Sequence, residues 1–273
     1  MITPAAAPDL AAVKARQQAT WSSGDYHAIG VRIVLVAEEL IESLDLRSTE
    51  TVLDVATGSG NAALAAARRG AEVTGADYVP ALLERARRRA DAESLEATFV
   101  PGDAEALPFE DGAFDVTASV FGAMFAPDQA RTASELARVT RSGGRIGLVA
   151  HTPEGFIGNL FRTVGRHVPP PAGVASPALW GTEARLGELF GPKAARMTSK
   201  RKMMVFRYAS PMDWVDEFRE LYGPVRMAFR AVGPDGAGAL EADLLDLVAR
   251  FNASGDETMV VPSEYLETVI VRA

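Results

Sequence analysis

Three acidic residues lie where ligand-binding side chains are commonly found. Asp54 precedes a turn that contains Gly58 and Gly60, and glycines let a backbone turn tightly and approach a ligand closely. Asp77 comes about 20 residues after this turn, where an acid commonly holds a ribose diol. Asp103 directly follows Gly102. The spacing of these residues predicts a site for a ligand that contains a nucleoside.

The charge of these residues restricts the ligand further. The segment Gly58–Ala63 also fits the glycine pattern of dinucleotide-binding turns, which place an anionic pyrophosphate at a helix N-terminus. Three carboxylates would repel that group, and the turn contains no basic residue to offset them. A charge pair at about 4 Å is worth roughly 4 kcal/mol at an effective dielectric constant near 20. The carboxylates therefore favour a ligand that carries a sulfonium and an ammonium group as well as an adenosine.

Alternating strand and helix patterns position these residues. Helical patterns cover 61–69, 80–92 and 129–139, and apolar, β-branched runs occur at 51–55, 72–76, 98–100, 114–120 and 145–150. Buried strands that alternate with helices predict an α/β fold with a doubly wound, mostly parallel, Rossmann-like sheet. Ligands of such sheets bind at the carboxyl ends of the strands. Asp54, Asp77 and Asp103 each follow a predicted strand, so we expect them to meet at that edge.

The segments on either side of this core complete a single structural domain with a lid. Residues 1–49 begin with a Pro/Ala-rich leader (1–8). The leader is followed by a short helix that Asp9 could cap and that runs to Gln18, a polar loop (21–27) and an amphipathic helix (31–44). Residues 50–150 form the ligand-binding core. Residues 151–273 supply two further strands, 200–208 and 265–272, which bring the predicted sheet to seven strands. Helices at 211–221 and 239–251 are expected to cover the carboxyl ends of the strands as a lid.

Several segments of the core together resemble a known family. The segments Val52–Asn61, Gly102–Phe109 with Asp111–Asp115, and Leu136–Arg145 resemble class I S-adenosylmethionine (SAM)-dependent methyltransferases. The similarity is greatest to the ubiquinone/menaquinone-biosynthesis-like group, often called type 11, and covers about residues 50 to 150. The resemblance implies a SAM cofactor and a small, largely apolar acceptor, such as a secondary metabolite, a quinone or an isoprenoid. It favours methylation of carbon, and methylation of oxygen or nitrogen stays open.

The resemblance also implies roles for individual residues. Asp54 and the backbone of Ala56, Thr57, Gly58 and Gly60 would hold the methionine end of SAM, and many relatives carry Cys at the position of Thr57. Asp77 would accept both ribose hydroxyl groups, and Tyr78 would pack beside the adenine. After Gly102, Asp103 would accept the adenine amino group and the Ala104 amide would reach a ring nitrogen. Phe121 would lie near the methionyl group and the acceptor, and Tyr26 would close over the cofactor.

Two histidines are candidates for catalysis. His151 directly follows the fifth predicted strand, at the edge of the expected acceptor pocket, where an imidazole could act as a general base. The alternative is a pocket-lining His151 held by hydrogen bonds. His27, beside Tyr26, could contact the cofactor or the substrate, and His167 is expected on a surface loop. No spacing of His, Asp and Glu predicts a metal site, and the chain has no cysteine.

Composition excludes several partners. The chain has 36 acidic and 28 basic residues, and the arginine run 85–89 is expected on a solvated helix face. The segment Ser119–Gly122 lacks the Asn/Asp-Pro-Pro-aromatic motif of enzymes that methylate amino groups of nucleic acids, so we expect no nucleic-acid acceptor. The start resembles no signal peptide and the early apolar run 33–37 is too short to span a membrane, which predicts a cytoplasmic protein without a membrane partner. A homo-oligomer, a nicotinamide-dependent oxidoreductase and a non-catalytic SAM-binding module stay open.

Overall fold

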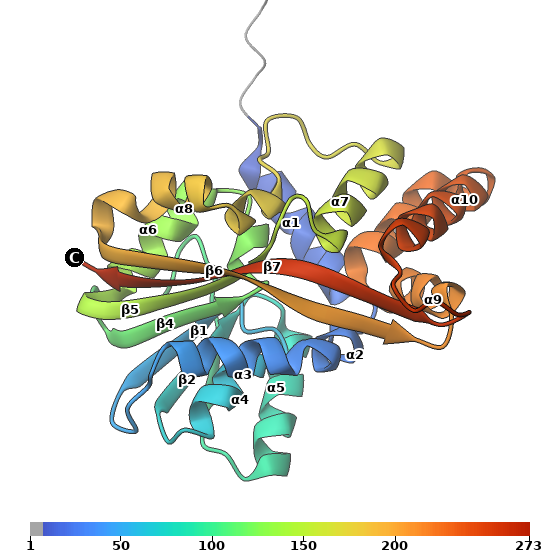
Figure 1. Ribbon diagram of the computed structural model, residues 1–273. Coiled ribbons are helices and arrows are strands. Elements are labelled where there is room, and N and C mark those ends of the chain that lie inside the picture. The colour runs from blue at the N-terminus through green and yellow to red at the C-terminus, as the bar shows by residue number, and fades with distance from the viewer. Residues whose placement is uncertain (1–7) are drawn as a thin grey trace, which may run out of the picture.

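A seven-stranded sheet forms the centre of the computed structural model, which describes residues 8–273 (Figure 1). The strand order is β3-β2-β1-β4-β5-β7-β6, and β7 runs antiparallel to both of its neighbours. The strands are β1 (Thr51–Val55), β2 (Glu72–Asp77), β3 (Thr98–Pro101), β4 (Phe114–Val120), β5 (Thr140–His151), β6 (Ala194–Tyr208) and β7 (Met259–Arg272). The prediction of a doubly wound, mostly parallel sheet of seven strands is confirmed. The predicted leader lies outside the described residues, apart from Pro8.

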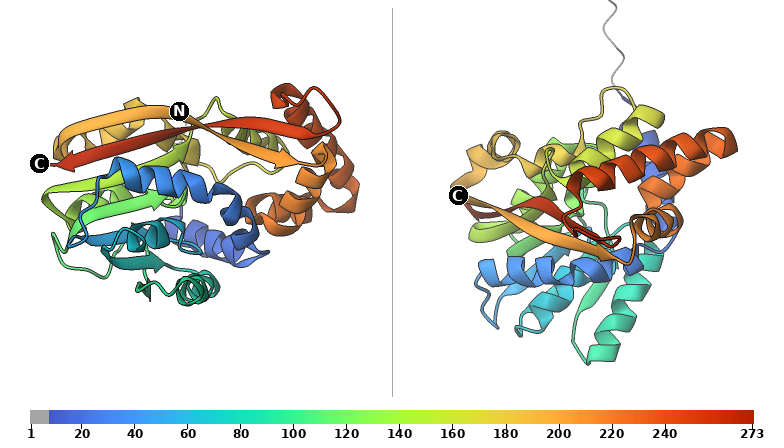
Figure 2. Two further views of the ribbon diagram at one scale, coloured as in Figure 1. Left: turned by 60° about the horizontal axis from the view of Figure 1, so that its bottom comes forward. Right: turned by 45° about the vertical axis from the view of Figure 1, so that its right-hand side comes forward.

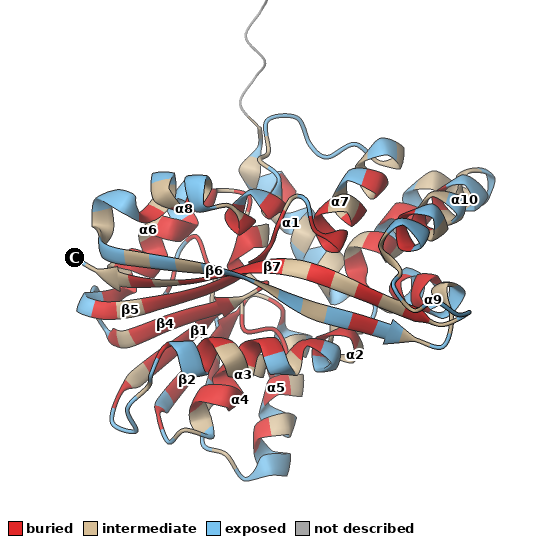
Figure 3. Ribbon diagram, in the orientation of Figure 1, coloured by how far each residue is buried: buried red, intermediate tan, exposed pale blue. Residues whose placement is uncertain are grey.

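Helices cover both faces of the sheet (Figures 1 and 2). One face carries α3 (Val34–Ser43), α4 (Asn61–Ala67) and α5 (Pro80–Glu93), and the other carries α6 (Gln129–Val139) and α8 (Glu183–Phe190). Gly147 on β5 allows a close approach of the first layer, since a Cβ there would lie 2.7 Å from Leu44 Cδ1. The central strands β1 and β4 are buried almost throughout, and β5 is buried along its second half, 146–151 (Figure 3).

The remaining helices gather toward the carboxyl ends of the parallel strands (Figure 1). They are α1 (Leu10–Ser22), α2 (Tyr26–Gly30), α7 (Phe156–His167), α9 (Pro211–Leu221) and α10 (Gly223–Phe251). Helices α7, α9 and α10 form a second hydrophobic cluster around Phe156, Trp214 and Phe218. Among residues 8–273, no helix is both long and apolar enough to cross a membrane.

Several predicted boundaries are wrong. Trp21 lies in the last turn of α1 and Tyr26 is the first residue of α2, although the sequence predicts a polar loop over 21–27. Strands β6 and β7 begin about six residues earlier than expected, because they pair along a long two-stranded ribbon. Helix α10 starts 16 residues before the predicted Ala239. Its first half is hidden in the sequence by Gly233, which is non-helical at φ 66°, and by Pro234.

Candidate functional site

The turn after β1 brings backbone and side chains together at the centre of the sheet edge. Ala56 and Gly58 both adopt left-handed backbone conformations, at φ 53° and 55°. This conformation is costly for alanine and natural for glycine. The Thr57 N–H donates to the carbonyl of Ala76 on β2 at 3.0 Å, which fixes the turn against the neighbouring strand. Asp54 lies beneath the turn and accepts hydrogen bonds from Thr57 Oγ1 at 2.6 Å and from the Ala63 N–H at 3.0 Å.

Asp77 links the turn to the end of β2. Its Oδ2 atom accepts the Gly58 N–H at 2.9 Å and its Oδ1 atom accepts the Val79 N–H at 2.8 Å. The residue is 7% exposed, and burial raises the pKa of its carboxyl group despite these hydrogen bonds. Asp77 is the last residue of β2, which therefore ends one residue later than the predicted strand 72–76. The carboxylate therefore holds the glycine turn and also faces the cavity described below.

The loop after β3 carries the third carboxylate. Asp103 Oδ1 accepts the Glu105 N–H at 2.9 Å, and the Gly102 N–H donates to the carbonyl of Asp77 at 3.0 Å. Asp103 Oδ2 forms an ion pair with Lys14 of α1 at 2.6 Å, and Lys14 also lies 2.5 Å from Glu105 Oε2. The glycine turn contains no basic residue, as the sequence shows. Helix α1, however, brings the Lys14 cation to the loop after β3 from a distant segment.

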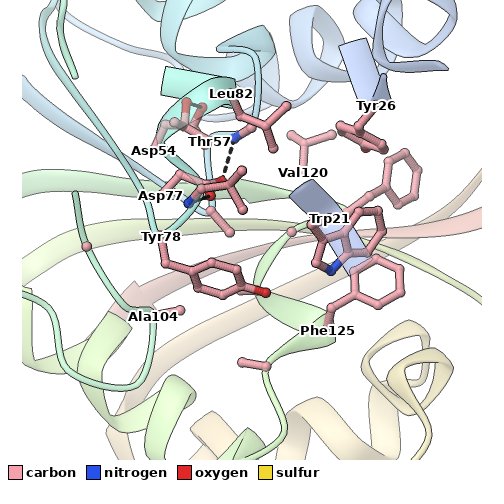
Figure 4. A pocket seen from close by; sticks show the side chains of 18 of the residues that line it. Trp21, Tyr26, Asp54, Thr57, Asp77, Tyr78, Leu82, Ala104, Val120 and Phe125 are labelled. Atoms are coloured by element: carbon pink, nitrogen blue, oxygen red, sulfur yellow. Dashed lines mark hydrogen bonds between the residues drawn. The ribbon is translucent and has the colours of Figure 1, made fainter. Parts of the chain in front are cut away.

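These segments surround one cavity of about 890 Å³, counting its open mouth (Figure 4). Among the residues predicted to bind a ligand, those that line it are Tyr26, Asp54, Ala56, Thr57, Gly58, Asp77, Tyr78, Gly102, Asp103, Ala104 and Phe121. Gly60 does not line it, because its backbone faces Ala86 and Phe99 in the core. The structure thus brings together segments that are far apart in the sequence.

The wall opposite the carboxylates is aromatic. Figure 4 shows Trp21, Tyr26 and Phe125 on one side of the cavity, across from Asp54 and Asp77. The ring centroid of Trp21 lies 5.4 Å from that of Tyr26 and 4.9 Å from that of Phe125, both edge to face. Sequence reasoning missed Trp21 and Phe125 as site residues. The one available signal was that Trp21 shares a short polar segment with Tyr26.

Comparisons with known proteins agree with this arrangement. Residues 52–144 match the model of a methyltransferase domain family. An uncharacterized protein of Mycobacterium tuberculosis is 38% identical over 97% of this chain and 96% of its own length. The demethylmenaquinone methyltransferase of Deinococcus radiodurans is 35% identical, over 59% of this chain and 69% of that protein. The chain belongs to the class I SAM-dependent methyltransferases.

Solved structures support the fold of this methyltransferase. The YcgJ protein from Bacillus subtilis matches with a TM-score of 0.60 at 21% identity, over 87% of this chain and 98% of that chain. A putative methyltransferase from Bacillus halodurans gives a TM-score of 0.59 at 22% identity, over 86% of this chain and 97% of that one. The family model and the Deinococcus radiodurans relative, and not these structures, confirm the predicted family, the enzyme class and the SAM cofactor.

His151 lies behind a residue that lines the cavity and does not line the cavity itself. His151 is the last residue of β5, and its ring stacks on Phe121 at a centroid distance of 3.9 Å and an angle of 9°. Phe121 forms the wall, so the prediction that His151 lies at the pocket edge is wrong. Burial lowers the pKa of His151 to about 3, and its Nδ1 atom has no hydrogen-bond partner among the described residues. A neutral, deeply buried imidazole of this kind is a poor general base.

The other predicted histidines also have structural contacts. His27 lies behind the glycine turn, where its Nδ1 atom is 3.2 Å from Ser59 Oγ, and it does not line the cavity. Burial and then the charge of Arg89 lower the pKa of His27. His167 ends α7 and pairs with Asp243 at 2.8 Å, so its placement on a loop is wrong. Within residues 8–273, no group of three His, Cys, Asp or Glu could hold a metal ion.

Part of the arginine run supports the site from behind. Arg89 donates to the carbonyl of Ser59 at 2.6 Å and to Asn61 Oδ1 at 2.8 Å, and Asn61 Nδ2 donates to the carbonyl of Gly30. Arg87 donates to the carbonyl of Phe99 at 2.6 Å. The expectation of a solvated helix face is confirmed for Arg87, which is exposed, and wrong for Arg89, which is partly buried behind the turn. Arg89 joins the glycine turn to the helix that carries Tyr26.

The ionisation of Asp54 should make stability depend on pH. Burial raises the pKa of Asp54 from 3.8 to about 7, so between these values the folded state binds a proton that the unfolded state releases. Stability is then lost as the pH rises through this range. Relative to Asp54→Asn, the wild type should lose about 3 kcal/mol of unfolding free energy between pH 5 and 8. Urea unfolding of both proteins at each pH measures this difference, and parallel curves would refute it.

Proposed function

We propose that this methyltransferase methylates a carbon atom of a small, flat, largely apolar acceptor, such as an electron-rich hydroquinone ring. The aromatic lining of the cavity, formed by the wall of Trp21, Tyr26 and Phe125 together with Phe121, carries this proposal, because aromatic faces favour flat apolar ligands and stabilise positive charge. The name of the Deinococcus radiodurans relative, demethylmenaquinone methyltransferase, points to an acceptor of the same class.

The residues of the cavity suit a SAM molecule. The glycine turn packs against Tyr26, since a Cβ on Gly58 would be in van der Waals contact with the Tyr26 ring at 3.5 Å. Asp54 would lie near the cationic methionine end, Asp77 would accept the ribose hydroxyl groups, and Asp103 with the Ala104 amide would recognise the adenine beside Tyr78. Bound SAM supplies an electrophilic methyl group on a sulfonium. Tyr26 would close over the turn and exclude water from the site.

The carboxyl groups that line the cavity are already paired or hydrogen-bonded. Among its described lining residues, Asp103 and Glu105 pair with Lys14, and Asp54 and Asp77 each accept two hydrogen bonds. Burial raises the pKa of Asp54 to about 7, but its proposed place beside the cationic methionine end commits it to the cofactor. Burial raises the pKa of Tyr26 to about 12, so its hydroxyl group stays protonated at neutral pH. This set favours an acceptor that is already nucleophilic, such as an electron-rich ring carbon, which gains the methyl group and releases its proton to solvent. Alignment in a water-poor pocket can then supply roughly 7–11 kcal/mol of the rate enhancement.

Calorimetry and product analysis test this proposal. We expect the protein to bind S-adenosylhomocysteine and to bind NADPH far more weakly. Incubated with methyl-labelled SAM and a panel containing a naphthohydroquinone, a simple phenol and a primary amine, it should label the hydroquinone on a ring carbon, as mass spectrometry can show. Tight NADPH binding without S-adenosylhomocysteine binding would contradict the cofactor site. Labelling of the phenol oxygen or the amine alone would contradict carbon methylation, and cofactor binding without any transfer would favour a non-catalytic module.

A further inference from the structure

Helix α1 reaches across the cavity mouth and is fixed to the core at two polar points. Lys14 contacts Asp103 at 2.6 Å and Glu105 at 2.5 Å, and Gln18 Nε2 donates to the carbonyl of Tyr78 at 2.6 Å. Lys14 and Trp21, one near each end of α1, both line the cavity. The helix therefore contacts the residues on both sides of the proposed adenine position.

Lys14 donates to the Asp103 oxygen atom with which a ligand would have to form a hydrogen bond. Asp103 Oδ1 accepts the Glu105 N–H within its own loop, at 2.9 Å. The other oxygen atom, Oδ2, accepts from Lys14. The side chains of Lys14 and Asp103 are 28% and 32% exposed, so the pair lies at the edge of the cavity rather than in the core. An amino group that approaches Asp103 from the cavity meets the Lys14 ammonium group.

We propose that Lys14 sets the affinity of the cofactor site, because binding exchanges the Lys14–Asp103 ion pair for a hydrogen bond between Asp103 and the adenine amino group. This inference depends on the proposed role of Asp103. Glu105 lowers the free-energy cost of this exchange. Its Oε2 atom still pairs with Lys14 when Asp103 binds the adenine, and its Oε1 atom accepts the Asp128 N–H at 2.8 Å. Lys14 is thus an affinity-determining residue that need not contact the reacting atoms.

Titration calorimetry with S-adenosylhomocysteine tests the exchange. This ligand lacks the sulfonium charge, and its ammonium and carboxylate groups give it no net charge, so removing the Lys14 charge changes its overall electrostatic attraction little. Lys14→Met and Lys14→Gln should each bind it about 3- to 10-fold more tightly than the wild type, because no ion pair has to be broken. Raising the salt concentration from about 0.05 to 0.5 M should tighten wild-type binding about twofold or more and leave both variants nearly unchanged, since salt screens the competing pair.

Two controls separate this effect from a general loss of charge. Arg16→Met removes one charge from the exposed face of the same helix and should bind like the wild type. In an Asp103→Asn background, Lys14→Met should bring no further gain. Equal or weaker binding by both Lys14 variants at the low salt concentration would overturn the inference while leaving the cofactor site in place. Failure of the wild type to bind S-adenosylhomocysteine would instead overturn the proposed function, and the inference with it.

Discussion

Replacing Asp77 by alanine should weaken S-adenosylhomocysteine binding about 10- to 150-fold, which calorimetry can measure. The reason is the loss of hydrogen bonds to a charged group, worth about 1.5–3 kcal/mol. The carboxylate is 7% exposed and lies at the cavity, so water replaces the lost bonds poorly. Asp77→Ala also leaves the N–H groups of Gly58 and Val79 without their acceptor, so part of the loss comes from a looser glycine turn.

Asp77→Asn separates the two contributions. The amide oxygen can still accept one of the two backbone N–H groups, but the amide removes the charge that favours the ribose hydroxyl groups. We expect Asp77→Asn to fold more stably than Asp77→Ala and still to bind more weakly than the wild type. Asp115→Asn is the matched control, because Asp115 accepts the Thr51 N–H at the opposite end of the strands and does not line the cavity. It should lower the melting temperature and leave the affinity unchanged, and unchanged affinity in both Asp77 variants would exclude Asp77 from the cofactor site.

The carboxylate side of the site could be predicted because its determinants are local. Asp54, Asp77 and Asp103 each stand at or just after the end of a buried strand, and parallel strands present those ends at one edge of the sheet. Each position therefore follows from a short segment of sequence. The order of the strands, which reverses between β1 and β4, then places all three around a single cavity.

The remainder of the site depends on contacts between distant segments. Lys14 lies 89 residues before Asp103, and no motif or periodicity connects them. The position of His151 depends on where β5 ends, because successive side chains of a strand point to opposite faces and an error of one residue reverses the assignment. Phe121 adopts a left-handed conformation at φ 52°, which its residue type does not indicate. These features arise from tertiary packing and not from local preference.

At Gly122 the loop after β4 lies close against the loop after β1. A Cβ on Gly122 would lie 2.6 Å from the carbonyl oxygen of Ala56 and 2.8 Å from its Cβ, so the backbone of one loop would have to move. Gly122→Ala should therefore lower the unfolding free energy by about 1–3 kcal/mol and the melting temperature by several degrees. Both residues line the cavity, so S-adenosylhomocysteine binding should weaken as well. Thermal unfolding with and without this ligand measures both effects.

Gly238→Ala is the matched control for this substitution. Gly238 lies in α10, where an added Cβ would meet nothing within 4 Å, so alanine should stabilise the helix by about 0.5–1 kcal/mol without changing ligand affinity. The opposite signs of the two glycine substitutions would show that crowding at the cavity, and not the loss of glycine itself, causes the defect. A Gly122→Ala protein with wild-type stability and affinity would mean that the two loops yield easily. In that case the shape of the cavity would depend mainly on helices α1 and α2, which also line it.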